Sequence, residues 1–101
     1  GGIYVEVMKD VAFRSFPLNR QETHYMIKET KTYPLLLGAR GSGKKDLNKT
    51  IETIIKIGAI LTEFPVISDI EINPLIVYDK GSGVKAVDTR ILLTSNQPGV
   101  H

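Results

Sequence analysis

The feature that most constrains the fold is a long apolar stripe in the middle of the chain. From residue 47 onward, apolar side chains recur at the three- and four-residue spacing of an α-helix, and most charged residues lie off that stripe. Asp46 is a suitable N-cap, and Phe64-Pro65 ends the pattern. The stripe consists of Leu47, Ile51, Ile54, Ile55, Gly58 and Leu61. A helix with one apolar face must pack on something, and we expect that partner to be a sheet.

Strands for that sheet are predicted at both ends of the chain. Residues 69–78 and 84–93 alternate apolar and polar side chains around a glycine-containing turn at residues 79–83, which predicts a β-hairpin. Near the start, the alternating residues 3–8 and 11–15 predict two shorter strands. A second hairpin that turns at Lys9-Asp10 is one arrangement of these two strands.

A second helix is predicted between the first strands and the long helix. Asn19 and Glu22 have the spacing of a capping box, so we expect a helix from about Arg20 to Thr30. Pro34 and the three glycines within residues 38–43 predict a loop after it.

The predicted order is therefore ββααββ. Such segregation favours an α+β fold, with a largely antiparallel sheet covered by two helices on one side. We expect one domain over residues 1–93 and a disordered tail over residues 94–101.

Composition excludes several classes of function. The 101 residues suffice for one domain and contain no cysteine, which removes disulfides, thiolate metal sites and cysteine nucleophiles. The net charge of +2 is too small to indicate nucleic acid or an anionic membrane as the main partner, and no apolar run is long enough to span a bilayer. We expect a cytoplasmic protein. Because the chain begins at Gly1-Gly2 and runs almost at once into a strand pattern, we also expect a fragment of something larger.

Residues 38–45, GARGSGKK, contain the G-x-x-x-x-G-K spacing of a phosphate-binding P-loop. A working P-loop follows a buried parallel strand, and a Ser or Thr after its lysine binds magnesium through the hydroxyl. Here that position holds Lys45, whose ammonium cannot ligate a metal, and Pro34 argues against a central strand before the loop. We interpret the motif as a surface loop, with a P-loop as the lesser alternative.

A stronger signal is the segment Glu71-Ile72-Asn73-Pro74. In an extended strand alternate side chains share a face, so Glu71 and Asn73 point one way while Ile70 and Ile72 point to the core. Pro74 lacks an amide proton and restricts the preceding residue, which predicts a strand that is edge-like or locally irregular. Two polar side chains are then held on one surface.

The hairpin brings a third polar residue into this surface. If Tyr78 pairs with Gly83 around a four-residue turn, paired residue numbers add up to 161 and Asp88 lies opposite Asn73. An amide oxygen and a carboxylate at that spacing, with Glu71 beside them, suit a magnesium ion that keeps several waters and binds phosphates. A slip of one residue would place Asp88 on the other face.

One alternative to a metal site remains open from the residues alone. Polar residues on the solvent-facing side of an antiparallel sheet are ordinary. His24 and His101 have no partners at ligand spacing, and we interpret both as surface residues.

Four segments in register resemble a known family. GGIYVEVMKDVAFR, YPLLLGARG, DIEINPLIV and AVDTR occur in this order, and they resemble the C-terminal half of the ATP-grasp domain of NDP-forming acyl-CoA synthetases, the ADP-forming acetate–CoA ligases. The resemblance covers residues 1 to about 93. The E-I-N-P-L segment is shared with the related β subunits of succinyl-CoA synthetase.

The resemblance implies roles for particular residues. Asn73 and Asp88 would hold the magnesium of bound ATP or ADP, the same pair that the hairpin register brings together. Glu71 would face a phosphohistidine delivered by a partner domain. Other positions implied for the nucleotide-facing surface are Glu6, Arg14 and the Gly1-Gly2 turn. For these three positions a structural role is at least as well supported.

The resemblance also implies a reaction and partners. In such enzymes acyl-CoA and phosphate give an acyl phosphate, whose phosphoryl group passes through a histidine to ADP. The expected partners are a CoA-binding, phosphohistidine-bearing subunit or domain and the N-terminal half of the ATP-grasp domain, so the chain alone should not catalyse the full reaction. A non-catalytic assembly module is the alternative, and separation of Asn73 from Asp88 would favour it.

Overall fold

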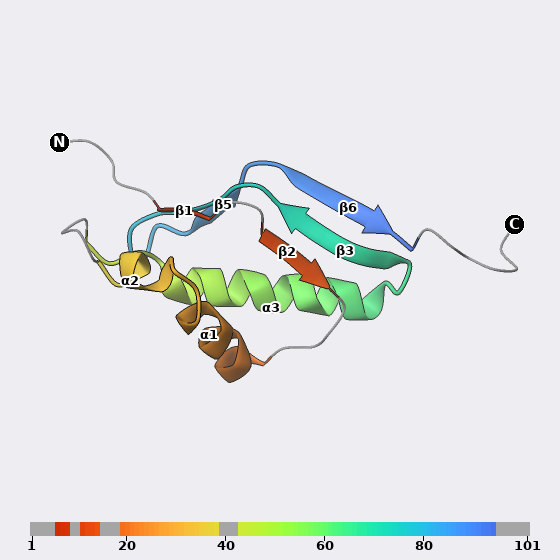
Figure 1. The fold of residues 1–101 in the computed structure, drawn as a ribbon, viewed down its shortest axis with the longest axis horizontal. Coiled ribbons are helices and arrows are strands. Elements are labelled where there is room, and N and C mark those ends of the chain that lie inside the picture. Colours follow the sequence, from red (N-terminus) through yellow and green to blue (C-terminus); the bar gives the residue numbers. More distant parts are fainter. Residues whose placement is uncertain (1–5, 9–10, 15–18, 39–42, 95–101) are drawn as a thin grey trace, which may run out of the picture.

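The computed structural model describes residues 6–8, 11–14, 19–38 and 43–94. The helices in these ranges are α1 (Arg20–Lys28), α2 (Tyr33–Leu36) and α3 (Leu47–Glu63). The strands are β1 (Glu6–Met8), β2 (Val11–Arg14), β3 (Ile67–Ile72), β4 (Leu75–Val77), β5 (Val84–Ala86) and β6 (Thr89–Leu93). Figure 1 shows α3 running along the length of the strands. Helices combined with purely antiparallel pairing confirm the predicted α+β fold.

The strands form two small antiparallel sheets that lie end to end. One has the order β1-β4-β5 and the other β2-β3-β6. Paired residue numbers add up to 83 from Glu6↔Val77 through Arg14↔Asp69, so β1 and β2 follow one register along β4 and β3. Likewise the β3–β6 hairpin keeps a single register, with a shift only between Ile67 and Asp69. The strand register of one three-stranded sheet therefore continues unchanged into the other sheet.

The predicted hairpin between the first two strands is wrong. β1 pairs with β4 and β2 pairs with β3, so both lie beside the inner strand of the C-terminal hairpin instead of beside each other. A two-residue hairpin turn favours glycine or asparagine, because its central residues need positive φ. Lys9-Asp10 offers neither. The inner strand of the C-terminal hairpin consists of β3 and β4. The backbone groups on its second edge need hydrogen-bond partners, and β1 and β2 supply them.

The helix boundaries follow from their caps. Asn19 and Glu22 form the predicted capping box: the Asn19 side chain accepts the Glu22 amide at 2.7 Å, and the Glu22 carboxylate accepts the Asn19 amide at 3.3 Å. Asp46 caps α3 as predicted, and α3 ends before Phe64. The short α2 was not predicted. Its Pro34 lies in the first turn, where a missing amide proton is tolerated.

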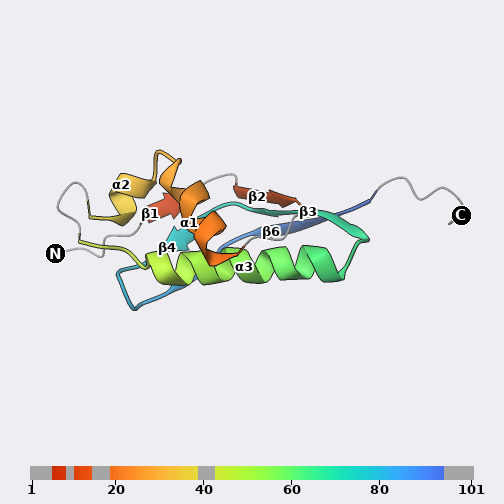
Figure 2. The same ribbon diagram turned by 90° about the horizontal axis from the view of Figure 1, so that it is seen from below.

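The core lies between α3 and the inner strands. At one end Ile57 and Leu61 of α3 pack with Ile70, Ile72 and Leu75. At the other end the buried residues come from α1, α2, α3 and β4, and they are Ile27, Leu36, Ile51, Ile54 and Val77. Figure 2 shows α1, α2 and the labelled strands along the same side of α3. The predicted apolar stripe of α3 therefore does pack on a sheet.

Only the first residue of the predicted tail falls within the described residues. The Thr94 amide donates to the Val66 carbonyl at 2.8 Å, so Thr94 still bonds to the loop before β3. Residues 95–101 lie outside the described residues. Among the helices described, none is long and apolar enough to cross a bilayer.

Candidate functional site

The candidate site lies where both strands of the C-terminal hairpin are interrupted. β3 ends at Ile72 and β4 starts at Leu75, while on the facing strand β5 ends at Ala86 and β6 starts at Thr89. The peptide bond between Asn73 and Pro74 is cis. The local irregularity predicted from Pro74 is therefore present, and it coincides with the junction between the two sheets.

The assumed hairpin register is confirmed across this junction. The Tyr78 amide donates to the Gly83 carbonyl at 3.0 Å, which closes the four-residue turn. The Asn73 amide donates to the Asp88 carbonyl at 2.9 Å, so these two residues are direct cross-strand neighbours. Both are exposed. The structure thus brings together the two residues that sequence analysis proposed as magnesium ligands.

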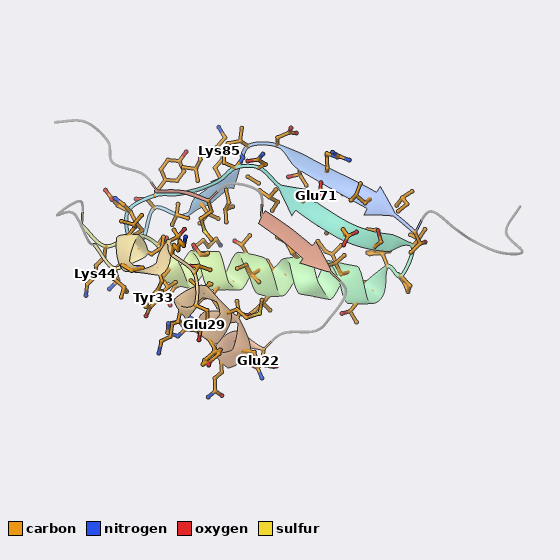
Figure 3. The ribbon with its side chains drawn as sticks, viewed as in Figure 1. Glu22, Glu29, Tyr33, Lys44, Glu71 and Lys85 are labelled. Carbon is orange, nitrogen blue, oxygen red and sulfur yellow. The ribbon has the colours of Figure 1, made fainter. Side chains whose placement is uncertain are left out.

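Glu71 lies beside this pair on the outer face of the sheet. Its neighbours Ile70 and Ile72 are only 4% and 3% exposed and pack against α3, so Glu71 lies on the opposite face. Figure 3 shows Glu71 over the β3–β6 part of the sheet, apart from the helices. The side chain is 41% exposed, so it is open to an incoming group.

Arg90 is a site neighbour that sequence analysis missed. It pairs with Glu71 across β3 and β6, and its Nε lies 3.8 Å from Glu71 Oε1. The signal was present, because the two residue numbers also add up to 161 in the assumed register. Arg90 places a positive charge beside the carboxylate expected to face a phosphorylated histidine.

The other implied nucleotide-facing positions do not meet at the junction. Glu6 on β1 pairs with Val77, and Arg14 on β2 pairs with Asp69, so their partners lie equally far to either side of Asn73 along the chain. Their side chains lie outside the described residues, as does the Gly1-Gly2 turn.

The P-loop alternative is wrong. The residues before the glycine-rich loop form the helical turn α2, where a P-loop needs a buried strand. Lys45, in the position of the magnesium-binding Ser or Thr, has a fully buried side chain whose Nζ contacts Asp79 Oδ1 at 2.8 Å. Its ammonium is therefore used inside the protein.

His24 is not an ordinary surface residue. It is partly buried on α1, its ring centroid lies 6.1 Å from that of Tyr33, and its Nε2 is buried without a hydrogen-bond partner among the described residues. His101 lies outside the described residues.

The donor chemistry of the junction fits magnesium. Asn73 and Asp88 supply an amide oxygen and a carboxylate, the hard oxygen ligands that magnesium prefers. Within the described part of the chain, no group of three or more His, Cys, Asp or Glu side chains could hold a metal.

Comparisons with known proteins agree with this fold. Residues 1–93 match the ATP-grasp domain. The fold and the sequence thus define a domain of the ATP-grasp class. The chain belongs to the ATP-grasp domain family.

Relatives within this family include CoA ligases. The chain is 39% identical over 94 residues to the β subunit of acetate–CoA ligase (ADP-forming) II from Pyrococcus furiosus, covering 92% of this chain and 40% of that subunit. It is 41% identical over 91 residues to 4-hydroxybutyrate–CoA ligase (ADP-forming) from Nitrosopumilus maritimus, covering 90% of this chain and 13% of that protein. The chain therefore spans about two fifths of the β subunit and a smaller share of the 4-hydroxybutyrate–CoA ligase.

A solved structure shows the same fold. Acetyl-coenzyme A synthetase 1 of Candidatus Korarchaeum cryptofilum superposes with a TM-score of 0.71 and 41% sequence identity, covering 77% of this chain and 36% of that one. That structure is a complex with coenzyme A and Mg-AMPPCP, in which the phosphohistidine segment points towards the nucleotide-binding site.

Proposed function

We propose that this chain supplies the magnesium ligands and one wall of the nucleotide site of an ADP-forming acid–CoA ligase. The observation that carries the proposal is the direct opposition of Asn73 and Asp88 at the sheet junction. Membership of the ATP-grasp family and similarity to acetate–CoA ligases support the same site. The proposed location is the cytoplasm.

The proposed division of labour at the site follows from its donors. Magnesium, when bound with ATP or ADP, supplies neutralisation of phosphate charge. Asn73 and Asp88 hold the ion on the outer face of the sheet, and Glu71 orients the histidine that carries the phosphoryl group. Phosphoryl transfer needs alignment and charge compensation more than covalent help from the protein. The three side chains serve those two needs.

The proposed overall reaction converts acyl-CoA, ADP and phosphate into free acid, CoA and ATP through a phosphohistidine. Because the chain spans 40% of one β-subunit relative, we infer that the remaining parts of the site come from elsewhere in the enzyme. The proposed partners are a CoA-binding, phosphohistidine-bearing subunit or domain and the N-terminal half of the ATP-grasp domain.

A non-catalytic assembly module was the alternative. It would have been favoured by a register that separates Asn73 from Asp88, and the observed register keeps them opposite.

The test is Asp88→Asn in the full-length enzyme. Removing one negative charge weakens an Mg²⁺ ligand while keeping the shape of the side chain, so we expect ATP formation at limiting magnesium to fall at least about tenfold. The measurement is the initial rate of ATP formation from acyl-CoA, ADP and phosphate across a magnesium titration. Folding should be unaffected, since Asp88 is exposed.

Lys85→Gln is the matched control. Lys85 is exposed on β5 of the same hairpin and lies apart from the helices (Figure 3). Its titration should overlay that of the unmodified enzyme. An unchanged titration for Asp88→Asn would rule out the proposed metal role.

A further inference from the structure

One buried carboxylate joins helix α3 to the turn of the hairpin that carries the site. Asp46 is 7% exposed. Its Oδ1 accepts the Lys49 amide at 3.0 Å, which caps α3. Its Oδ2 accepts the Gly83 amide at 2.7 Å and the Gly81 amide at 3.2 Å, both in the turn between β4 and β5. Charge-assisted bonds of this kind are stronger than neutral ones.

The backbone around Asp46 reinforces the same junction. The Asp46 amide donates to the Tyr78 carbonyl at 2.8 Å, and the Lys80 amide donates to the Lys44 carbonyl at 3.0 Å. Between them, Lys45 and Asp79 form an antiparallel bridge as well as their side-chain ion pair. We call residues 44–46 the anchoring segment. Figures 1 and 2 both show the β4–β5 turn beside the N-terminal end of α3, and Lys44 lies at this end in Figure 3.

The anchored turn has a conformation that few sequences adopt. Gly81 and Gly83 have φ of +89° and +87°, values that residues other than glycine rarely adopt. Both amides that donate to Asp46 Oδ2 come from these two glycines. A turn held in one conformation determines which residues face each other along the strands that follow.

The turn register reaches the proposed magnesium site without a shift. From Val77↔Val84 to Leu75↔Ala86 the paired residue numbers add up to 161, and the Asn73–Asp88 hydrogen bond keeps that total. A slip of one residue at the turn would move every side chain of one strand to the other face. It would separate Asn73 from Asp88.

We propose that Asp46 is a positioning residue for the magnesium site. By binding turn 79–83 to the start of α3, it selects the hairpin register in which Asn73 lies opposite Asp88. This inference rests on the proposed function of that pair. Lys45 and Asp46, the two residues directly after the G-x-x-x-x-G-K stretch, therefore anchor the hairpin.

Asp46→Asn separates the two roles of this side chain. The amide oxygen of asparagine still accepts the Lys49 amide, and asparagine is as good an N-cap as aspartate. Its NH₂ group cannot accept the Gly81 and Gly83 amides, so the link to the turn is lost. Asp46→Ser is a second variant that also retains the cap. Circular dichroism of each variant checks that the fold is retained.

Asn19→Ala is the matched control. It removes the N-cap of α1, where Asn19 accepts the Glu22 amide at 2.7 Å, and leaves the hairpin contacts of Asp46 intact. Loss of an N-cap lowers the free energy of unfolding, so Asn19→Ala controls for a general loss of stability.

Two measurements on the full-length enzyme test the proposal. The first is amide hydrogen exchange over residues 70–90 without magnesium. For Asp46→Asn we expect about tenfold faster exchange at Asn73 and Val87, whose amides donate across the junction, and no change for Asn19→Ala. The second is the magnesium concentration for half-maximal ATP formation, which should rise about fivefold or more for Asp46→Asn only.

Unchanged exchange over residues 70–90 in both Asp46 variants would overturn the proposal. So would faster exchange with an unchanged magnesium requirement, because Asp46 would then stabilise the hairpin without affecting the site. If instead Asp88→Asn leaves the magnesium titration unchanged, the proposed function fails. The exchange measurement then still decides whether Asp46 sets the register.

Discussion

Glu71 and Arg90 form an exposed ion pair next to the proposed magnesium site. Their side chains lie on the outer face of the sheet at 3.8 Å, with 41% and 71% of the surface exposed. Exposed ion pairs of this kind contribute little to folding, because water and salt screen them. The carboxylate remains open to a phosphorylated group approaching from outside.

At the residue scale we predict that Glu71→Gln separates activity from stability. The free energy of unfolding should change by less than about 0.5 kcal/mol, since only an exposed pair is lost. Single-turnover transfer from the phosphohistidine to ADP should slow by at least about tenfold, because the side chain no longer carries a charge to orient the imidazole.

Glu29→Gln serves as the control for Glu71→Gln. Glu29 carries an exposed carboxylate at the end of α1. The substitution should leave both quantities unchanged. Equal transfer rates for the two variants would contradict the role of Glu71.

At the scale of elements, the loop between α2 and α3 depends on two glycines with positive φ. Gly38 and Gly43 have φ of +100° and +81°. A Cβ on Gly38 would lie 3.2 Å from the carbonyl carbon and 3.3 Å from the oxygen of Gly43. A Cβ on Gly43 would meet no described atom within 4 Å. The two positions share backbone strain but differ in crowding.

We therefore predict different costs for alanine at these positions. Gly43→Ala should destabilise the protein by about 1 kcal/mol, the cost of placing a side chain at positive φ. Gly38→Ala should cost more, because the added methyl group also crowds the Gly43 carbonyl. Chemical denaturation of both variants measures the difference. A Gly38→Ala that is as stable as Gly43→Ala would show that the loop relaxes freely.

At the scale of the whole molecule, one core joins the helices to both sheets. α3 packs along the inner strands of both sheets, so the hairpin and the first strands form one structural unit. The proposed metal pair lies on the outer face, away from that core. Partners can therefore approach the site without disturbing the packing.

We predict that the 101-residue chain by itself forms no ATP from acyl-CoA, ADP and phosphate. The proposed reaction needs a phosphohistidine and a CoA site, which we assign to other parts of the enzyme. A luciferase-based ATP assay with the isolated chain, and with the full-length enzyme as positive control, measures this. ATP formation by the chain alone would contradict the proposed division of the active site.

Local pattern was sufficient for much of the fold. The caps at Asn19 and Asp46 and the stripe of α3 depend on neighbours within a few residues, and the structure confirms them. The register that opposes Asn73 and Asp88 was also predictable, because a four-residue turn leaves one alignment for the strands beside it. Arg90 followed from that same register and was overlooked.

Long-range packing decided the rest. The sequence by itself determined where α1, α3 and the strands form, since propensity, caps and apolar spacing act locally. Only the tertiary structure decided that β1 and β2 pair with the inner strand of the C-terminal hairpin, because the choice depends on which exposed edge is available. The tertiary structure also decided that Lys45 and Asp46 are buried against the distant turn at residues 79–83. Contacts between segments more than 30 residues apart leave no periodic trace in the sequence.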